Sequence, residues 1–267
     1  MPTKRSQQNA EASRTSVSPL NRKGTLYMVA VSIGHPDDVT LRAIRILGEV
    51  DILASEDPNM TQALLMHHGI HATVTSYGPQ NLREKAAVLL YRLQQGHDVA
   101  FLSDCGSPLI ADPGHFLVAA AHAHNIRVVP VPGPSAIIAA LTVAGFSCDS
   151  FCFLGHLPSA SSRIAQYLND SLRRNGPTVA FCAGSSVSRI LKILEDISPR
   201  RSVAVAYDLT RPTEHIIRGT ACEIRERLSP AHGQEVTLIL AGKDGTEWGD
   251  RGVRHAQSLS SRRIKTR

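Results

Sequence analysis

The sequence predicts an α/β protein of two lobes, the first built on a parallel sheet and the second on a mixed sheet. In the first half, short β-prone runs alternate with helix-like segments, which is typical of a parallel sheet covered by helices. In the second half, from about residue 145, some strands follow one another without a helix between them, which indicates a mixed sheet. With 267 residues, the chain is long enough for two cores, and the cleft between them is the expected ligand site.

Five apolar runs of the first half are predicted strands, and helical spacing of apolar residues follows the first four. Leu41, Ile44 and Leu47 show this spacing, and Gly69 and Gly96 follow two of the segments as helix stops. The predicted strands are 26–31, 51–54, 73–76, 99–102 and 128–131, and the predicted helices are 40–47, 61–68, 82–95 and 114–124. Together they make up an N-terminal domain over residues 24–140.

The second half also consists of predicted strands and helices, but they follow one another in a different order. The predicted strands are 151–154, 178–182, 202–207, 214–219 and 236–241, and the predicted helices are 164–174, 188–197 and 221–228. They define a C-terminal domain over residues 141–243.

Composition points to a soluble, cytoplasmic protein. Apolar residues make up 42% and charged residues 19% of the chain, as in ordinary globular proteins. The longest apolar run, 136–146, is far short of the ~20 residues that a membrane span needs. The five cysteines lack the paired spacing of a metal site, so reduced thiols and no metal are expected.

The positive charge is concentrated at the two ends of the chain. Residues 1–23 carry a net charge of +4 and residues 251–267 one of +6, whereas residues 24–250 carry −4. Both ends are poor in apolar residues, so 1–23 and 244–267 are predicted to be disordered tails. Such tails either hold a polyanion such as RNA by counterion release or are simply solvated.

Two loops at the carboxyl ends of predicted strands are the candidate ligand site. Ser103–Gly114 (SDCGSPLIADPG) follows the fourth strand, and Pro132–Ala136 (PGPSA) follows the fifth. Ligands of parallel sheets lie beyond these ends, and small residues allow close approach to the backbone. Ser135 is in a position to cap the helix that follows.

Acidic residues follow the first two strands. The loop after the first strand has neither a GxGxxG nor a Walker pattern, so a phosphate cradle is not expected there. Asp38 either caps the helix beginning near residue 40 or contacts a ligand. Glu56 and Asp57 serve either as base or substrate clamp, or as caps of the next helix.

The order of motifs resembles the tetrapyrrole-methylase superfamily of S-adenosylmethionine-dependent methyltransferases. The motifs are SIGHPDDVTLRAIRIL, SEDPNMT, LSDCGSPLIADPG, PVPGPSA, FLGHLP and AYDLTRPTEHIIRGT, and they extend over residues 24–241. Within this superfamily, the sequence is most similar to the enzymes that methylate the 2′-hydroxyl of a cytidine in 16S ribosomal RNA.

The resemblance implies two α/β domains, a homodimer and an S-adenosylmethionine molecule in the interdomain cleft. It places cofactor contacts on both loops and on the C-terminal lobe, at Cys105, Gly106, Ser107, Ile110, Ser135, Ala136, Cys182 and Asp208. For the general base that a ribose hydroxyl needs, the candidates are Glu56, Asp57, Asp38 and Glu214. The implied partner is ribosomal RNA or the small ribosomal subunit.

The sequence departs from the pattern of the RNA enzymes on the expected substrate side. His35 stands where the pattern TPIGN has asparagine, and Asn59 where the pattern EDTR has arginine. His156 stands where the pattern LGFLP has phenylalanine. The Tyr–Glu pair of YESPHR is also absent from Cys182–Arg189. Methylation of a tetrapyrrole or another small molecule is therefore the alternative function, and an inactive binding protein on the same scaffold is the third.

Overall fold

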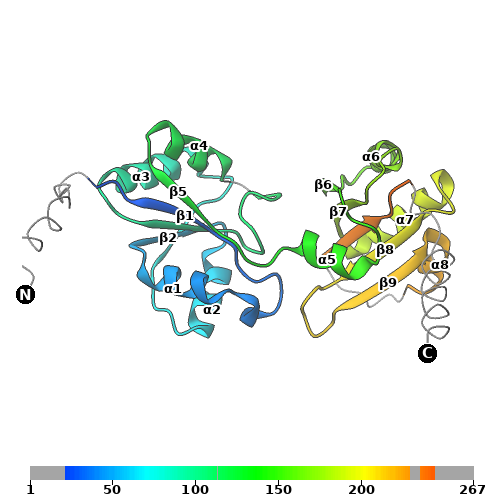
Figure 1. The fold of residues 1–267 in the computed structure, drawn as a ribbon, viewed down its shortest axis with the longest axis horizontal. Coiled ribbons are helices and arrows are strands. Elements are labelled where there is room, and N and C mark those ends of the chain that lie inside the picture. Colours follow the sequence, from blue (N-terminus) through cyan, green and yellow to red (C-terminus); the bar gives the residue numbers. More distant parts are fainter. Residues whose placement is uncertain (1–21, 113, 229–234, 244–267) are drawn as a thin grey trace, which may run out of the picture.

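The computed structural model describes residues 22–112, 114–228 and 235–243, which form two lobes joined at residues 132–135 (Figure 1). Apart from Arg22 and Lys23, the predicted basic tails lie outside these ranges, as does Pro113. The Lys23 ammonium donates a hydrogen bond of 2.8 Å to the carbonyl of His124. The chain is thus bound to the first lobe from this residue onward.

The first sheet is fully parallel, as predicted. Its order is β3-β2-β4-β1-β5, and each pair of neighbours is parallel. The central strand β4 is buried at all four residues, since helices cover both faces of the sheet. The strands are β1 (Thr25–Val29), β2 (Ile52–Ser55), β3 (Val74–Ser76), β4 (Val99–Leu102) and β5 (Arg127–Val131).

Four helices cover the first sheet, two on each face. In Figure 1, α1 and α2 lie on one side of the sheet and α3 and α4 on the other. Each face has its own apolar core, one centred on Leu47 and Leu65 and the other on Leu89 and Leu117. The helices are α1 (Leu41–Glu49), α2 (Pro58–His67), α3 (Leu82–Gln94) and α4 (His115–Ala123).

The second sheet is mixed, which confirms the second part of the fold prediction. Its order is β6-β7-β10-β8-β9; β6 and β7 are parallel, and the remaining pairs are antiparallel. The strands are β6 (Cys152–His156), β7 (Thr178–Ala183), β8 (Ser202–Tyr207), β9 (His215–Thr220) and β10 (Glu235–Leu240).

Helix α5 (Ala136–Ala144) covers one face of the second sheet, and three helices cover the other. These are α6 (Ser161–Leu172), α7 (Val187–Ile197) and α8 (Ala221–Glu226). Ile137 and Leu141 of α5 pack against Ala204 and Ile239 of the sheet. The packing therefore groups α5 with the second sheet, and the boundary expected at residues 140/141 falls inside this helix. No described helix is long and apolar enough to cross a membrane.

Candidate functional site

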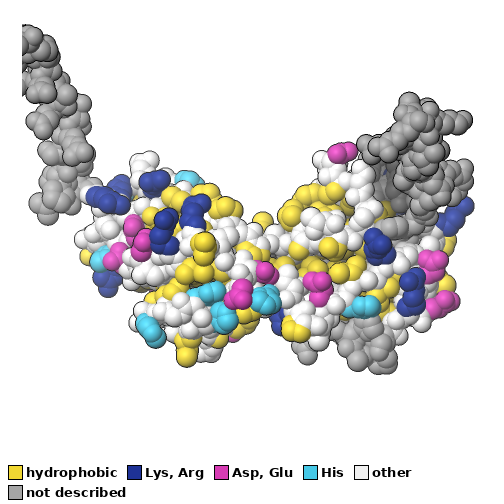
Figure 2. Space-filling model, turned by 60° about the horizontal axis from the view of Figure 1, so that its bottom comes forward, with side chains coloured by type: hydrophobic (Ala, Val, Ile, Leu, Met, Phe, Trp, Pro, Cys, Tyr) yellow, Lys and Arg dark blue, Asp and Glu magenta, His cyan; other side chains and the backbone are white. Residues whose placement is uncertain are grey.

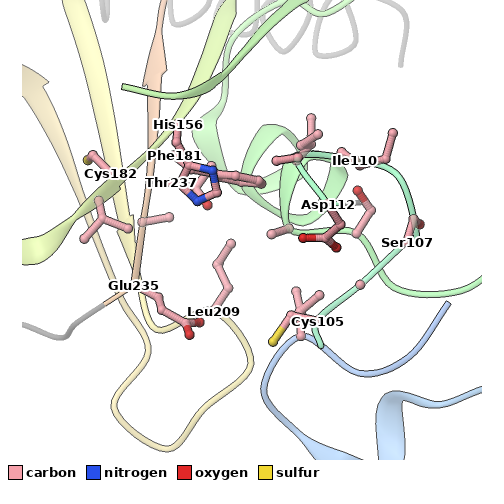
Figure 3. Close-up of a pocket in the computed structure, with 18 of the residues that line it drawn as sticks. Cys105, Ser107, Ile110, Asp112, His156, Phe181, Cys182, Leu209, Glu235 and Thr237 are labelled. Atoms are coloured by element: carbon pink, nitrogen blue, oxygen red, sulfur yellow. The ribbon is translucent and has the colours of Figure 1, made fainter. Parts of the chain in front are cut away.

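A cavity of about 420 Å³ lies between the two lobes. Figure 2 shows the hollow between the lobes, with apolar side chains along it. In Figure 3, Cys105 and Asp112 lie on one side of the cavity, opposite Cys182 and Leu209. Strand-end loops of the first lobe thus face strands β7, β8 and β10 of the second.

The structure brings together most of the residues expected to bind a cofactor. Seven of the eight line the cavity, namely Cys105, Gly106, Ser107, Ile110, Ser135, Ala136 and Cys182. Asp208 does not line it, although the next residue, Leu209, does. The Asp208 carboxylate instead accepts a hydrogen bond of 2.9 Å from the Thr213 hydroxyl.

The first loop folds back onto the end of β1. The Gly106 carbonyl accepts a hydrogen bond of 2.9 Å from the Val31 amide, and the buried Ser103 hydroxyl donates to the same carbonyl at 3.0 Å. Leu109 and Ala111 adopt positive φ angles of 72° and 67°, which L residues rarely do. Such strained backbone is concentrated at functional sites, where the surrounding structure enforces it.

The second loop brings the N-terminus of α5 to the cavity. A Cβ added at Gly133 would lie 3.1 Å from the Ala30 Cβ, so this loop passes close to the end of β1. Ser135 occupies the N-cap position, but its side chain makes no capping hydrogen bond, which corrects the sequence prediction. Ser135, Ala136 and Ile137 instead line the cavity.

Three carboxyl groups form an acidic cluster at one end of the cavity: Glu56, Asp104 and Asp112. Burial, followed by the charges of Glu56 and Asp104, raises the pKa of Asp112 to about 6. Burial and the Asp104 charge also raise the pKa of Glu56. Asp104 links the loops that follow β4 and β2, since its Oδ1 accepts a hydrogen bond of 2.8 Å from the Asp57 amide.

None of the four predicted catalytic acids lines this cavity, and two of them hold backbone in place. Asp57 caps α2, because its Oδ1 accepts hydrogen bonds from the amides of Asn59 and Met60, 2.8 Å and 3.3 Å away. Glu214 accepts a hydrogen bond of 2.7 Å from the Thr210 amide. Glu56 belongs to the acidic cluster but does not itself line the cavity.

Asp38, the fourth acid, is exposed on a short 3-10 helix, Pro36–Asp38. Of the two roles open to Asp38 in the sequence, capping the following helix is wrong. Thr40 caps α1 instead, its hydroxyl accepting a hydrogen bond of 3.2 Å from the Ala43 amide. The threonine directly precedes the first helical residue and so occupies the cap position itself.

A second cavity of about 360 Å³ adjoins the first, and Asp104 and Cys105 line both. Its walls come from the loop after β1, from α2, from the end of β4 and from Arg211 of the second lobe. His67 also lines it, and its Nε2 lies 2.8 Å from Oδ1 of Asp37. Sequence reasoning missed Arg211 and His67, because no local pattern indicates which surface residues will face another lobe.

Besides the Cys182 thiol, the second lobe adds an imidazole and a carboxylate to the first cavity, those of His156 and Glu235. His156 was noted in the sequence as a departure from the family pattern, whereas Glu235 was missed. Within the described ranges, no group of three or more His, Cys, Asp or Glu side chains is arranged to hold a metal ion.

We expect Asp112→Asn to stabilise the protein above neutral pH. A raised pKa means that the folded protein binds the proton more tightly than the unfolded chain does. The stability that Asp112 contributes is therefore full below its ordinary pKa of 3.8 and is lost as the pH rises through about 6. Because the group is only half-buried, we expect a gain of about 1 kcal/mol at pH 8 and a clearly smaller gain at pH 5, measured by urea unfolding. Asp170→Asn, on the exposed side of α6, is the control, and an equal gain for both variants would contradict the interpretation.

Comparison with known proteins identifies the family. The sequence profile of the tetrapyrrole (corrin/porphyrin) methylases matches residues 25–225. The chain is 37% identical over 234 residues to ribosomal RNA small subunit methyltransferase I of Haemophilus influenzae, covering 85% of this chain and 82% of that protein. It is 41% identical over 235 residues to the Escherichia coli O157:H7 protein of the same name, covering 85% and 81%.

A solved structure shows the same fold. Cobalt precorrin-4 methyltransferase, a cobalamin biosynthetic enzyme, superposes with a TM-score of 0.60 at 19% identity, covering 84% of this chain and 96% of that protein. Three observations agree with this family. They are the fold of one parallel and one mixed sheet, the cavity between the lobes that both motif loops line, and the profile match over most of the chain. The chain belongs to the tetrapyrrole methylase family of methyltransferases.

Proposed function

We propose that this methyltransferase uses S-adenosylmethionine to methylate the 2′-hydroxyl of a cytidine in small-subunit ribosomal RNA. The observation that carries the proposal is the interlobe cavity, which is lined by both of the loops that resemble cofactor loops. Two relatives at 37% and 41% identity are named ribosomal RNA small subunit methyltransferase I, which supports ribosomal RNA as the substrate class. The cytoplasm is the proposed location, since ribosomal subunits are found there.

The cavity suits the proposed methyl donor in size and chemistry. Its walls are largely apolar, from Ile33, Ile137, Phe181, Ala206 and Leu209, as an adenine ring and a thioether require. The first turn of α5 has amide groups without partners inside the helix, and these favour an anionic group such as a carboxylate. We therefore propose that the seven cavity-lining residues named above bind the donor, with Leu209 in the place expected for Asp208.

The donor would supply an electrophilic methyl group, and the chain would align it with the acceptor. In the transfer, the hydroxyl oxygen would form a bond to the methyl carbon as the carbon–sulfur bond of the donor breaks, and the hydroxyl proton would pass to a base of this chain. Because alignment alone accelerates such a displacement strongly, the main task of the loops is to hold both reactants. Among the four candidate acids we favour Glu56 as the proton acceptor. Its raised pKa makes it a better base, and it lies beside Asp104, which lines both cavities.

A homodimer is the proposed assembly. The outward face of α5 supports this proposal, since Ile138 and Val143 on this helix are 52% and 41% exposed. A helix that is apolar all round is normally covered on all sides. Sedimentation of the full chain tests this proposal.

Methyl incorporation tests the proposed substrate. Purified full-length protein would be incubated with S-adenosylmethionine carrying a labelled methyl group. The acceptors are small ribosomal subunits from cells that lack the modification, the free RNA, and uroporphyrinogen III. We expect stoichiometric labelling of the subunit at one cytidine, mapped by the pause of reverse transcription at a 2′-O-methyl group. Labelling of the tetrapyrrole instead of either RNA would replace this proposal by the alternative function. No labelling together with no donor binding by calorimetry would favour an inactive binding protein.

A further inference from the structure

The loop between β8 and β9 is held in a single conformation by its own acidic residues. The Arg211 amide donates to the Asp208 carbonyl at 3.0 Å, and the Glu214 amide donates to the Arg211 carbonyl at 2.9 Å. The Glu214 carboxylate accepts from the Thr210 amide, and the Asp208 carboxylate accepts from the Thr213 hydroxyl. Asp208 and Glu214, two residues that the sequence suggested for the site, thus position the loop between them.

The same loop is strained and is pressed against the first lobe. Asp208 and Thr210 have positive φ angles of 45° and 65°, and this conformation is especially unfavourable for a β-branched residue such as Thr210. The Thr210 hydroxyl accepts a hydrogen bond of 2.9 Å from the His35 amide. A Cβ added at Gly34 would lie 2.6 Å from the Leu209 carbonyl oxygen and 2.8 Å from Cγ of Arg211. Strain that is held by such contacts is typical of a functional segment.

Two side chains of this loop, two positions apart, line two different cavities. Leu209 lines the first cavity, and Arg211 lines the second. Glu235, at the start of β10, lines the first cavity, and its carboxylate lies 3.2 Å from the Arg211 guanidinium. This ion pair therefore lies where the two cavities meet.

The ion pair faces Cys105, one of the two residues that the cavities share. Burial, followed by the Glu235 charge, raises the pKa of the Cys105 thiol to about 11, and the Arg211 charge opposes this shift. Both charges thus act on a thiol of the other lobe. A group passing between the cavities would pass Cys105, Arg211 and Glu235.

The ion pair leaves part of the Arg211 guanidinium without a partner among the described residues. Its Nε is shielded from solvent and has no hydrogen-bond partner among the described residues. The side chains of Arg211 and Glu235 are 40% and 61% exposed, and ion pairs this exposed contribute only ~0–1 kcal/mol. A phosphate offers two or three acceptor oxygens to the planar guanidinium and can therefore compete with Glu235.

We propose that Arg211 binds a phosphate group of the RNA substrate in the second cavity and so places the acceptor ribose at the junction beside Cys105. Phosphate takes the place of the Glu235 carboxylate on the guanidinium. Arg211 is then a substrate-positioning residue, and the strained loop is the device that holds it. This inference rests on the proposed function, since it assumes a nucleotide substrate.

A mononucleotide tests the subsite without any methylation. Binding of 5′-CMP and of cytidine is measured by equilibrium dialysis with labelled ligand, in the presence of saturating S-adenosylmethionine. We expect the wild type to prefer 5′-CMP by about tenfold, as a charge-assisted contact would provide. Arg211→Gln should remove this preference, Glu235→Gln should increase it, and Arg92→Gln, on the exposed side of α3, should leave it unchanged. If the ion pair were purely structural, Arg211→Gln and Glu235→Gln would change the preference for 5′-CMP in the same direction.

The salt dependence of subunit binding provides the second readout. A lost phosphate contact lowers the slope of log affinity against log salt by about one, so Arg211→Gln should show this decrease. Thermal unfolding of each variant confirms that it is folded. No preference for 5′-CMP in the wild type, or an unchanged preference in Arg211→Gln, would overturn the inference. If the wild type binds 5′-CMP through Arg211 yet methylates no ribosomal RNA, the subsite stands and the proposed function fails.

Discussion

Replacing Gly34 by alanine is expected to lower methyl transfer by about 100-fold. The added Cβ would lie 2.6 Å from the Leu209 carbonyl oxygen, 2.7 Å from the Thr210 hydroxyl and 2.8 Å from Cγ of Arg211. Real Cβ atoms do not approach other atoms so closely, so residue 34 or the loop 208–211 of the other lobe must shift at this point. A displacement of about 1 Å between bound reactants is enough for an effect of this size. Methyl incorporation at saturating donor and acceptor concentrations measures it.

Gly48→Ala is the matched control for this variant. Gly48 lies in α1, and a Cβ added there meets nothing within 4 Å. Because alanine is the better helix former, this variant should be more stable by about 0.5–1 kcal/mol and fully active. If Gly34→Ala were as active as Gly48→Ala, the loop 208–211 would not set the distance between the lobes, and the positioning role of Arg211 would lose its basis.

Filling the first cavity is expected to abolish donor binding. Ala136 is half-buried at the first position of α5, and it lines the cavity of about 420 Å³. Ala136→Trp would place an indole ring in this space, in which the adenine ring of the donor, of similar bulk, is proposed to bind. We expect the affinity for S-adenosylmethionine to fall by more than about 100-fold, measured by calorimetry, since overlapping atoms exclude one another. The unfolding temperature should change little, because the cavity accommodates the ring.

The control for this experiment is Ala87→Trp, on the exposed side of α3. It adds the same side chain to the first lobe and should leave donor binding unchanged. Undiminished affinity in Ala136→Trp would place the donor elsewhere and would contradict the proposed cofactor site. Lost affinity in both variants would indicate a general effect of tryptophan on the fold, and thermal unfolding would detect it.

The sequence alone predicted the sheets because their signals are local. Apolar runs such as 99–102 and helical spacing such as that of Leu41, Ile44 and Leu47 depend on neighbours within one turn or one strand. The cofactor loops were equally predictable from the sequence, because glycine permits positive φ angles and close approach to the backbone, and proline fixes φ, wherever they occur. The helix caps were less so. Capping was one of the two roles open to Asp38, but Thr40 caps the helix instead, since a helix boundary shifts by a residue or two with tertiary packing. Ser135 does occupy the N-cap position, yet its side chain makes no capping hydrogen bond.

The roles of the charged residues were decided by tertiary structure alone. Glu56, Asp57, Asp38 and Glu214 were indistinguishable as candidate bases in the sequence, whereas the structure engages Asp57 and Glu214 with backbone amides. Arg211 and Glu235 are 24 positions apart and form an ion pair only because β8 and β10 are neighbours in the second sheet.

The sequence by itself thus determined the two sheets and the loops that line the cavity between them. Only the tertiary structure decided which polar groups face that cavity and its neighbour. The physical reason is range: backbone preferences act between adjacent residues, whereas the environment of a charge depends on every element packed around it.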